Sequence, residues 1–150
     1  MKFMGISEDR LHHIYSVAKR CYEIAKCKGY SEDFARRMFM IGWNHDVGYE
    51  FATNSVDHAT VGSELLGLMG ISSDRIGSKT KHAIRKHGRF TNTKSTEWLI
   101  LNQADMTVDS KGNVVTVEER LEDIAKRYGE NSDVYDNARS IAVLVGLLEE

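Results

Sequence analysis

The residues with the clearest chemical potential are His45 and Asp46, which stand side by side at the end of the apolar segment MFMIGWNHD. Imidazole and carboxylate groups are standard ligands of zinc, iron and manganese. An adjacent pair can therefore hold a metal ion at the end of a buried helix. Because the dipeptide also arises by chance, its meaning depends on whether other ligand-type side chains converge on it.

Helical periodicity indicates which other histidines turn inward. An α-helix advances by about 100° per residue, so each side chain can be placed on a face. His13 lies at the margin of the apolar arc of its segment, whereas His12 projects with charged residues. His87 shares an apolar face that His82 does not. The ligand-type residues predicted to face inward are His13, His45, His58, His87 and Asp105, with Asp46 beside His45.

This set has an ordinary interpretation as well as a chemical one. A single histidine on an apolar face is most often a hydrogen-bonded core residue. Asp105 could be exposed at a helix end or paired with an arginine, although an unpaired buried carboxylate would be costly. One metal centre would satisfy all of these groups, but periodicity alone does not choose between the two interpretations.

The elements that must position these residues are predicted to be helices. The chain contains no proline, where average usage of about 5% would give several, and proline interrupts helix interiors. Gly29 and Gly129 are predicted to follow helix ends. Residues 114–117, VVTV, could form a short extended stretch without an obvious partner. The predicted N-caps are Ser7, Ser31, Ser73, Ser95, Thr116 and Ser132. The seven predicted helices span about 8–28, 32–46, 58–69, 74–87, 95–108, 117–128 and 133–148.

Length and composition indicate a single globular domain over residues 1–150, with an all-α, compact bundle of about six to seven helices. The chain is 41% hydrophobic and 28% charged, and its net charge of −2 offers no electrostatic basis for a nucleic-acid partner. No segment approaches the roughly 20 apolar residues of a membrane span, and the first residues lack a signal-peptide pattern. Cys21 and Cys27 are read as reduced thiols, which favours a cytoplasmic location.

Five segments together resemble the HD superfamily of metal-dependent phosphohydrolases, over residues 10 to about 110. The order H…HD…H…H…D is that of the subgroup with two metals, and it is much more specific than the dyad alone. The matching segments are RLHHIYSVA with His13, FMIGWNHDVGYEF with His45 and Asp46, HATVGSELL with His58, AIRKHGR with His87, and LNQADMTVD with Asp105. The resemblance implies an HD-like helical fold on which the C-terminal helices, 117–148, pack.

The resemblance also implies roles for these residues. His13, His45, Asp46 and Asp105 would hold one divalent metal, His58 and His87 a second, and Asp46 would bridge both. Mixed imidazole and carboxylate ligands suit iron, manganese or zinc. The implied reaction is hydrolysis of a phosphomonoester or phosphoanhydride, with a nucleotide as one candidate substrate, through a metal-bound hydroxide. Of the basic residues around His87, Arg89 and Lys86 are the candidates to stabilise the negative charge that develops on the phosphate.

The chain departs from the family at two places. Tyr49 stands where many relatives have lysine, and the arginine that often follows the last aspartate is absent from DSKG at 109–112. Two other functions are compatible with this pattern: an HD-fold di-iron oxygenase, and a non-catalytic regulatory module whose metal site is structural or lost. The sequence leaves open the substrate, the metal, a homodimer and the role of residues 110–150.

Overall fold

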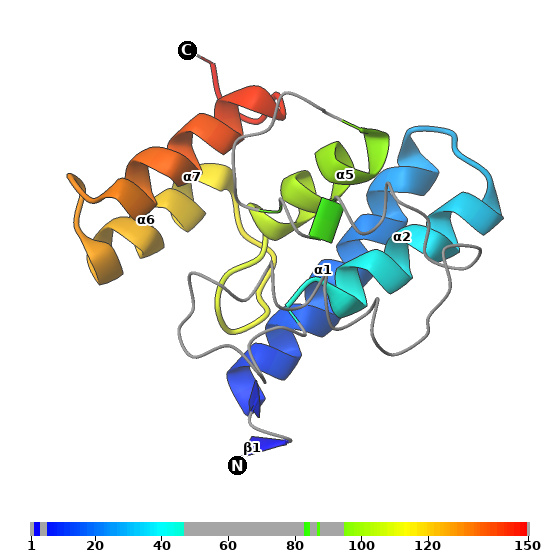
Figure 1. Cartoon of the computed structure of the whole chain (residues 1–150), viewed down its shortest axis with the longest axis horizontal. Coiled ribbons are helices and arrows are strands. Elements are labelled where there is room, and N and C mark those ends of the chain that lie inside the picture. Colours follow the sequence, from blue (N-terminus) through cyan, green and yellow to red (C-terminus); the bar gives the residue numbers. More distant parts are fainter. Residues whose placement is uncertain (1, 4–5, 47–82, 85–86, 88–94, 150) are drawn as a thin grey trace.

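The computed structural model describes residues 2–3, 6–46, 83–84, 87 and 95–149, and this part of the chain is mainly helical, with short hairpins at the N-terminus and at residues 107–115 (Figure 1). The all-α prediction is thus confirmed for these residues. None of the described helices is both long and apolar enough to cross a membrane. The predicted helix 58–69 and most of 74–87 lie outside the described residues. The elements are β1 (Lys2–Phe3), β2 (Ile6–Ser7), α1 (Glu8–Cys27), α2 (Glu32–Asn44), α5 (Thr96–Asp105), α6 (Val117–Tyr128) and α7 (Asp133–Leu144).

Each described helix begins at a predicted N-cap. In all five helices the cap hydroxyl accepts a hydrogen bond from the backbone N–H three residues later, at 3.1–3.2 Å. Such a bond satisfies one of the donors that the first helical turn leaves without a partner. The predicted cap Ser73 lies outside the described residues. The five caps that the structure describes are Ser7, Ser31, Ser95, Thr116 and Ser132.

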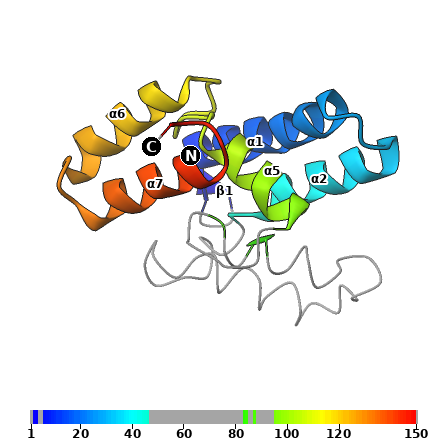
Figure 2. The same ribbon diagram turned by 90° about the horizontal axis from the view of Figure 1, so that it is seen from above.

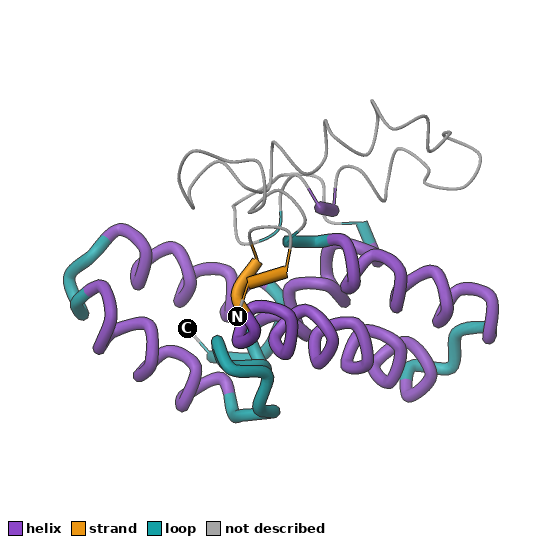
Figure 3. The backbone as a smooth tube through the Cα atoms, turned by 90° about the horizontal axis from the view of Figure 1, so that it is seen from below, coloured by secondary structure: helices purple, strands orange, loops and turns teal. Residues whose placement is uncertain are grey.

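Helices α1 and α2 form an antiparallel pair, and α5 packs against both of them (Figure 2). The pair comes close together where Gly42 meets α1, because a Cβ at Gly42 would lie only 2.7 Å from Cα of Ala18. The core between the three helices contains Trp98 and Met38, whose side chains are fully buried. The short β1–β2 hairpin, which the sequence did not predict, precedes α1 directly (Figure 3).

Helices α6 and α7 lie side by side at the other end of the molecule (Figures 1 and 2). Val117 and Leu121 of α6 and Ile141 of α7 belong to the same apolar cluster as Trp98 of α5. The Gln103 side-chain amide also donates a hydrogen bond of 2.8 Å to the backbone carbonyl of Val145, which follows α7. The C-terminal helices therefore share the core of the helices that precede them.

The end of α5 differs from the prediction. The helix was expected to continue to residue 108, but it ends at Asp105 and residues 107–115 turn back on themselves. The backbone N–H of Val115 donates to the carbonyl of Thr107 at 3.0 Å, and Val108 forms a β-bridge with Val114. The sequence offered no obvious partner for an extended stretch at 114–117, and the structure shows that Val108 pairs with Val114 of this stretch. Helix α5 ends here because the backbone groups of these residues bond across the hairpin, which competes with continuing the helical hydrogen bonds.

Candidate metal centre

His13 projects from the first half of α1 into the interior. Its side chain is buried, whereas the neighbouring His12 is exposed, as the periodicity predicted. The Nδ1 atom lies 2.8 Å from the backbone carbonyl of Asp109, which can only accept, so Nδ1 carries the proton. The Nε2 atom faces Oδ1 of Asp105, 3.0 Å away, and Oδ2 of Asp46, 3.6 Å away.

His45 caps the C-terminal end of α2, which was predicted to extend to residue 46. Its Nδ1–H donates to the carbonyl of Gly42 at 2.6 Å, so the side chain itself satisfies a carbonyl of the last helical turn. Its Nε2 atom is buried and lies 3.3 Å from Oδ2 of Asp46 and 3.5 Å from Oδ1 of Asp105. Among the described residues, this nitrogen has no hydrogen-bond partner of good geometry.

His87 repeats the local arrangement of His45. Its Nδ1–H donates to the carbonyl of Ile84, also three residues earlier, at 2.5 Å. Its Nε2 atom lies 3.3 Å from Oδ1 of Asp46, and the ring packs edge-on against the ring of His45. Three imidazoles from separate parts of the chain thus converge on Asp46.

Asp46 lies between the three rings with its two oxygens facing different partners. Oδ2 faces His13 and His45, whereas Oδ1 faces His87. The side chain is 3% exposed. Two overlapping groups of ligand atoms result, one of His13, His45 and Asp105 and the other of His45, Asp46 and His87. Such a carboxylate is able to bridge two ions.

The charges of the two carboxylates dominate the electrostatics of the site. Burial alone would favour neutral His45, but the charge of Asp46 and the contact with Asp105 outweigh it and raise the pKa of His45 to about 10. Partial burial likewise opposes ionisation of Asp105, but the contacts with His13 and His45 hold its pKa well below the usual range. The site therefore favours a positive charge between the nitrogens and the carboxylates.

The donor set fits a metal ion. With each Nδ1–H bonded to a backbone carbonyl, the Nε2 atoms face carboxylate oxygens, an arrangement that places either a proton or a metal ion between them. The five Nε2-to-oxygen distances lie between 3.0 and 3.6 Å. Ligand atoms around an ion at about 2.0–2.1 Å are themselves about 3.0–3.4 Å apart. The described residues could therefore hold a metal ion with little rearrangement.

Arg10 is a residue of the site that sequence reasoning missed. Its Nη1 atom lies 3.0 Å from Oδ2 of Asp46, and the side chain remains 30% exposed. Arg10 precedes His13 by three residues on α1, so the two share a helical face. The spacing of three residues could have placed Arg10 beside His13, but it gives no indication of the contact with Asp46 from the end of α2.

Three predicted site residues, His58, Lys86 and Arg89, lie outside the described residues. The described positions that the structure brings together are His13, His45, Asp46, His87 and Asp105. Comparisons with protein-family models, with curated proteins and with solved structures found no match for this chain.

Proposed function

We propose that this chain is a metal-dependent phosphohydrolase of the HD type. The supporting observation is the convergence of three buried imidazoles, each with its Nδ1–H on a backbone carbonyl and its Nε2 directed at Asp46 or Asp105. A ring held in this way is a typical metal ligand, because the hydrogen bond fixes both its tautomer and its orientation. Separate core histidines would not need to converge on two carboxylates with their Nε2 atoms.

The proposed ligands divide between two divalent ions. His13, His45 and Asp105 would hold the first, His87 the second together with His58, and Asp46 would contact both. Imidazole and carboxylate donors suit iron, manganese or zinc. When bound, such ions supply charge that polarises a phosphoryl group and lowers the pKa of water. The substrate class is a small phosphomonoester or phosphoanhydride, with nucleotides as candidates.

Arg10 would contribute the positive side chain that phosphoryl transfer requires. Its guanidinium lies 3.0 Å from Asp46 and is also partly exposed, so it borders both the buried ligands and solvent. A planar guanidinium can bind two phosphate oxygens at once. Arg10 would therefore orient the phosphate and balance its developing charge. Lys86 and Arg89 remain further candidates for the same role.

The proposal is tested by metal analysis and turnover of the same purified protein. We expect two iron, manganese or zinc ions per chain and hydrolysis of at least one ester in a panel of aryl phosphates and nucleotides. Double replacement of His45 and Asp46 by alanine should abolish metal retention and turnover together. If the double variant keeps the full metal content, the ligand assignment is wrong.

The same preparation separates the two other functions. A mixed-valent iron signal in EPR, without hydrolysis of any ester, would replace the hydrolase proposal with an oxygenase. Retained metal with neither reaction would indicate a structural metal in a regulatory module.

The role of Arg10 has its own test. Replacing Arg10 by alanine should lower kcat/KM by about 10²-fold or more while leaving the metal content unchanged, and lysine should restore only part of the loss. Arg36→Ala is the matched control, because Arg36 is an exposed arginine whose described ion pair is with Glu32. Equal activity of the Arg10→Ala and Arg36→Ala variants would remove Arg10 from the mechanism.

A further inference from the structure

His13 differs from the other two imidazoles in the source of its hydrogen-bond acceptor. His45 and His87 each use a backbone carbonyl three residues earlier in the chain. His13 lies within α1, where neighbouring carbonyls already accept helical hydrogen bonds. Its acceptor is the carbonyl of Asp109, which is 96 residues away in the chain. The orientation of His13 therefore depends on a distant segment.

That segment is the loop 109–113, DSKGN, which closes the hairpin after α5. The Asp109 carboxylate accepts hydrogen bonds from the backbone N–H of Lys111 at 2.9 Å and of Asn113 at 2.8 Å, and from the Asn113 side-chain amide at 3.1 Å. The Asp109 N–H in turn donates to the carbonyl of Asn113 at 2.9 Å. One side chain thus holds the shape of the whole loop.

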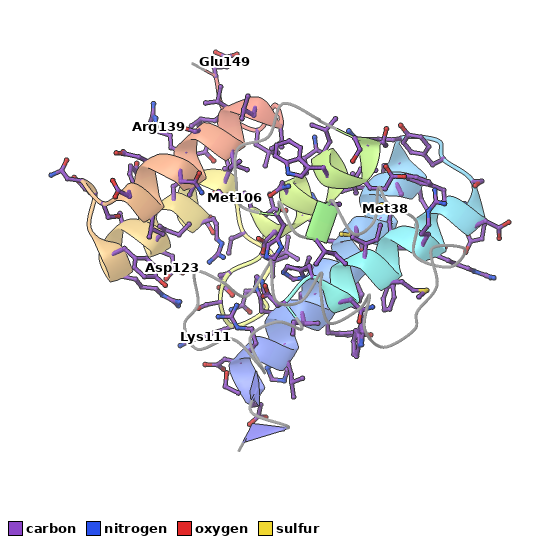
Figure 4. All side chains as sticks on the ribbon, viewed as in Figure 1. Met38, Met106, Lys111, Asp123, Arg139 and Glu149 are labelled. Atoms are coloured by element: carbon purple, nitrogen blue, oxygen red, sulfur yellow. The ribbon has the colours of Figure 1, made fainter. Side chains whose placement is uncertain are left out.

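The loop lies directly on α1. Gly112 has a φ of +89°, and a Cβ there would lie 2.6 Å from the carbonyl oxygen of His12, so only glycine fits without displacement. The Ser16 hydroxyl donates to the carbonyl of Gly112 at 2.6 Å, one helical turn beyond His12. The loop thus contacts α1 at His12, just before His13, and at Ser16, one turn after it. Figure 4 shows Lys111 beside this part of α1.

Helix α6 supports the same loop. The Arg127 guanidinium contacts the hydroxyl of Ser110, and Asp123 pairs with both Arg127 and Arg120. Figure 4 shows Asp123 on α6, in the region of the loop. The loop therefore joins the C-terminal helices to the helix that carries His13.

We propose that Asp109 is a positioning residue for the metal centre, which acts by holding the loop carbonyl that fixes the Nδ1–H tautomer of His13. The inference rests on the metal site of the proposed function, but it does not depend on the reaction that the site performs. It assigns a role to DSKG, the segment in which the arginine expected from the resemblance is absent. The Asp109 side chain makes none of the described contacts with the ligand atoms, so it acts through the loop backbone.

The test measures Co²⁺ affinity by competition with a chelator and reads the His13 ring by ¹⁵N NMR. Asp109→Ala removes three hydrogen bonds and should weaken Co²⁺ binding by about 10–100-fold, the effect of losing support behind a metal ligand. In the metal-free protein, it should also move the ¹⁵N shifts of His13 from the Nδ1–H tautomer toward a mixture. Asp109→Asn keeps an oxygen for the two backbone N–H groups and should restore most of the affinity.

Two further variants separate positioning from general stability. Ser16→Ala leaves every bond of Asp109 in place and removes only the tether to Gly112, so it should weaken Co²⁺ binding by about two- to tenfold. Ser132→Ala removes the N-cap of α7 without touching the loop, and its Co²⁺ affinity should equal that of the unmodified chain.

Unchanged affinity and unchanged His13 shifts in Asp109→Ala would overturn the proposal, and so would an equal loss of affinity in Ser132→Ala. If Asp109→Ala does not fold, Ser16→Ala provides the same test, and wild-type affinity there would overturn the proposal. Because both readouts are independent of turnover, failure of the hydrolase proposal would be recognised separately.

Discussion

Replacing Asp46 by asparagine removes the charge at the centre of the three imidazoles while keeping the size and shape of the side chain. Asp46 is 3% exposed, and its oxygens lie 3.3 Å from Nε2 of both His45 and His87. The amide can place an oxygen toward one ring only, and its nitrogen cannot bind a metal ion. The substitution therefore tests the site with little change in packing volume.

The expected magnitude follows from His45. The difference between its ordinary pKa of 6.5 and the value of about 10 corresponds to ~5 kcal/mol in favour of a positive charge at this position. Coulomb's law with an effective dielectric constant of about 20 gives a similar ~5 kcal/mol for two unit charges 3.3 Å apart. Asp46 and Asp105 lie at similar distances from His45, so we assign about half, ~2–3 kcal/mol, to Asp46. A divalent ion should therefore lose at least about 30-fold in affinity.

The assay is Mn²⁺ binding to the metal-free protein, followed by competition with a chelator at constant pH. The control is Asp33→Asn, the same chemical change at an exposed residue in the first turn of α2, and its Kd should stay at the unmodified value. If Asp46→Asn binds Mn²⁺ with a Kd within about fivefold of the unmodified protein, the assignment of Asp46 to the metal centre is refuted.

Three other predictions follow from the described geometry. Gly42→Ala should destabilise the protein by ~1–3 kcal/mol and lower Tm by about 3–10 °C, because the added methyl meets the backbone of α1; a rise in Tm, usual for Gly→Ala within a helix, would contradict this contact. The exposed thiol of Cys27 should react with a thiol reagent in the native protein, whereas Cys21, whose pKa is raised by burial and by the nearby Asp105 charge, should react only after unfolding; two reactive thiols per native chain would be inconsistent with this packing. The folded chain raises the pKa of His45 above its ordinary 6.5, so the contribution of His45 to the free energy of unfolding of the metal-free protein should be complete below pH 6.5 and should be lost as pH rises toward about 10. Urea titrations at several pH values should show this decline. An equally steep decline in Asp46→Asn would argue against the Asp46 charge as its cause.

The helices were predictable because their signals are local. An N-cap hydroxyl bonds a backbone N–H three residues later, so the whole interaction is written within four consecutive residues. Ser31 and Thr116 illustrate this, since the helices that follow them begin where predicted. The choice of His13 over His12 has a similar basis, because helical periodicity depends only on the residues of α1.

The end of α5 was not predictable in the same way. Periodicity favoured a helix to residue 108, but the β-bridge between Val108 and Val114 and the docking of Gly112 on α1 decide the turn. These contacts are made between segments, and their energies do not appear in the propensity of either segment alone. The contact of Arg10 with Asp46 spans 36 residues and was missed for the same reason.

The sequence by itself determined that His13, His45 and His87 turn inward and, through carbonyls three residues earlier, how His45 and His87 direct their Nε2 atoms. Only the tertiary structure decided how His13 is oriented, because no carbonyl near it on α1 is available and the acceptor comes from Asp109. It also decided which oxygen of Asp46 faces which ring. The physical reason is the range of the interactions. Facing follows from the pitch of one helix, whereas the convergence of ligand atoms within 4.8 Å depends on how separate helices pack.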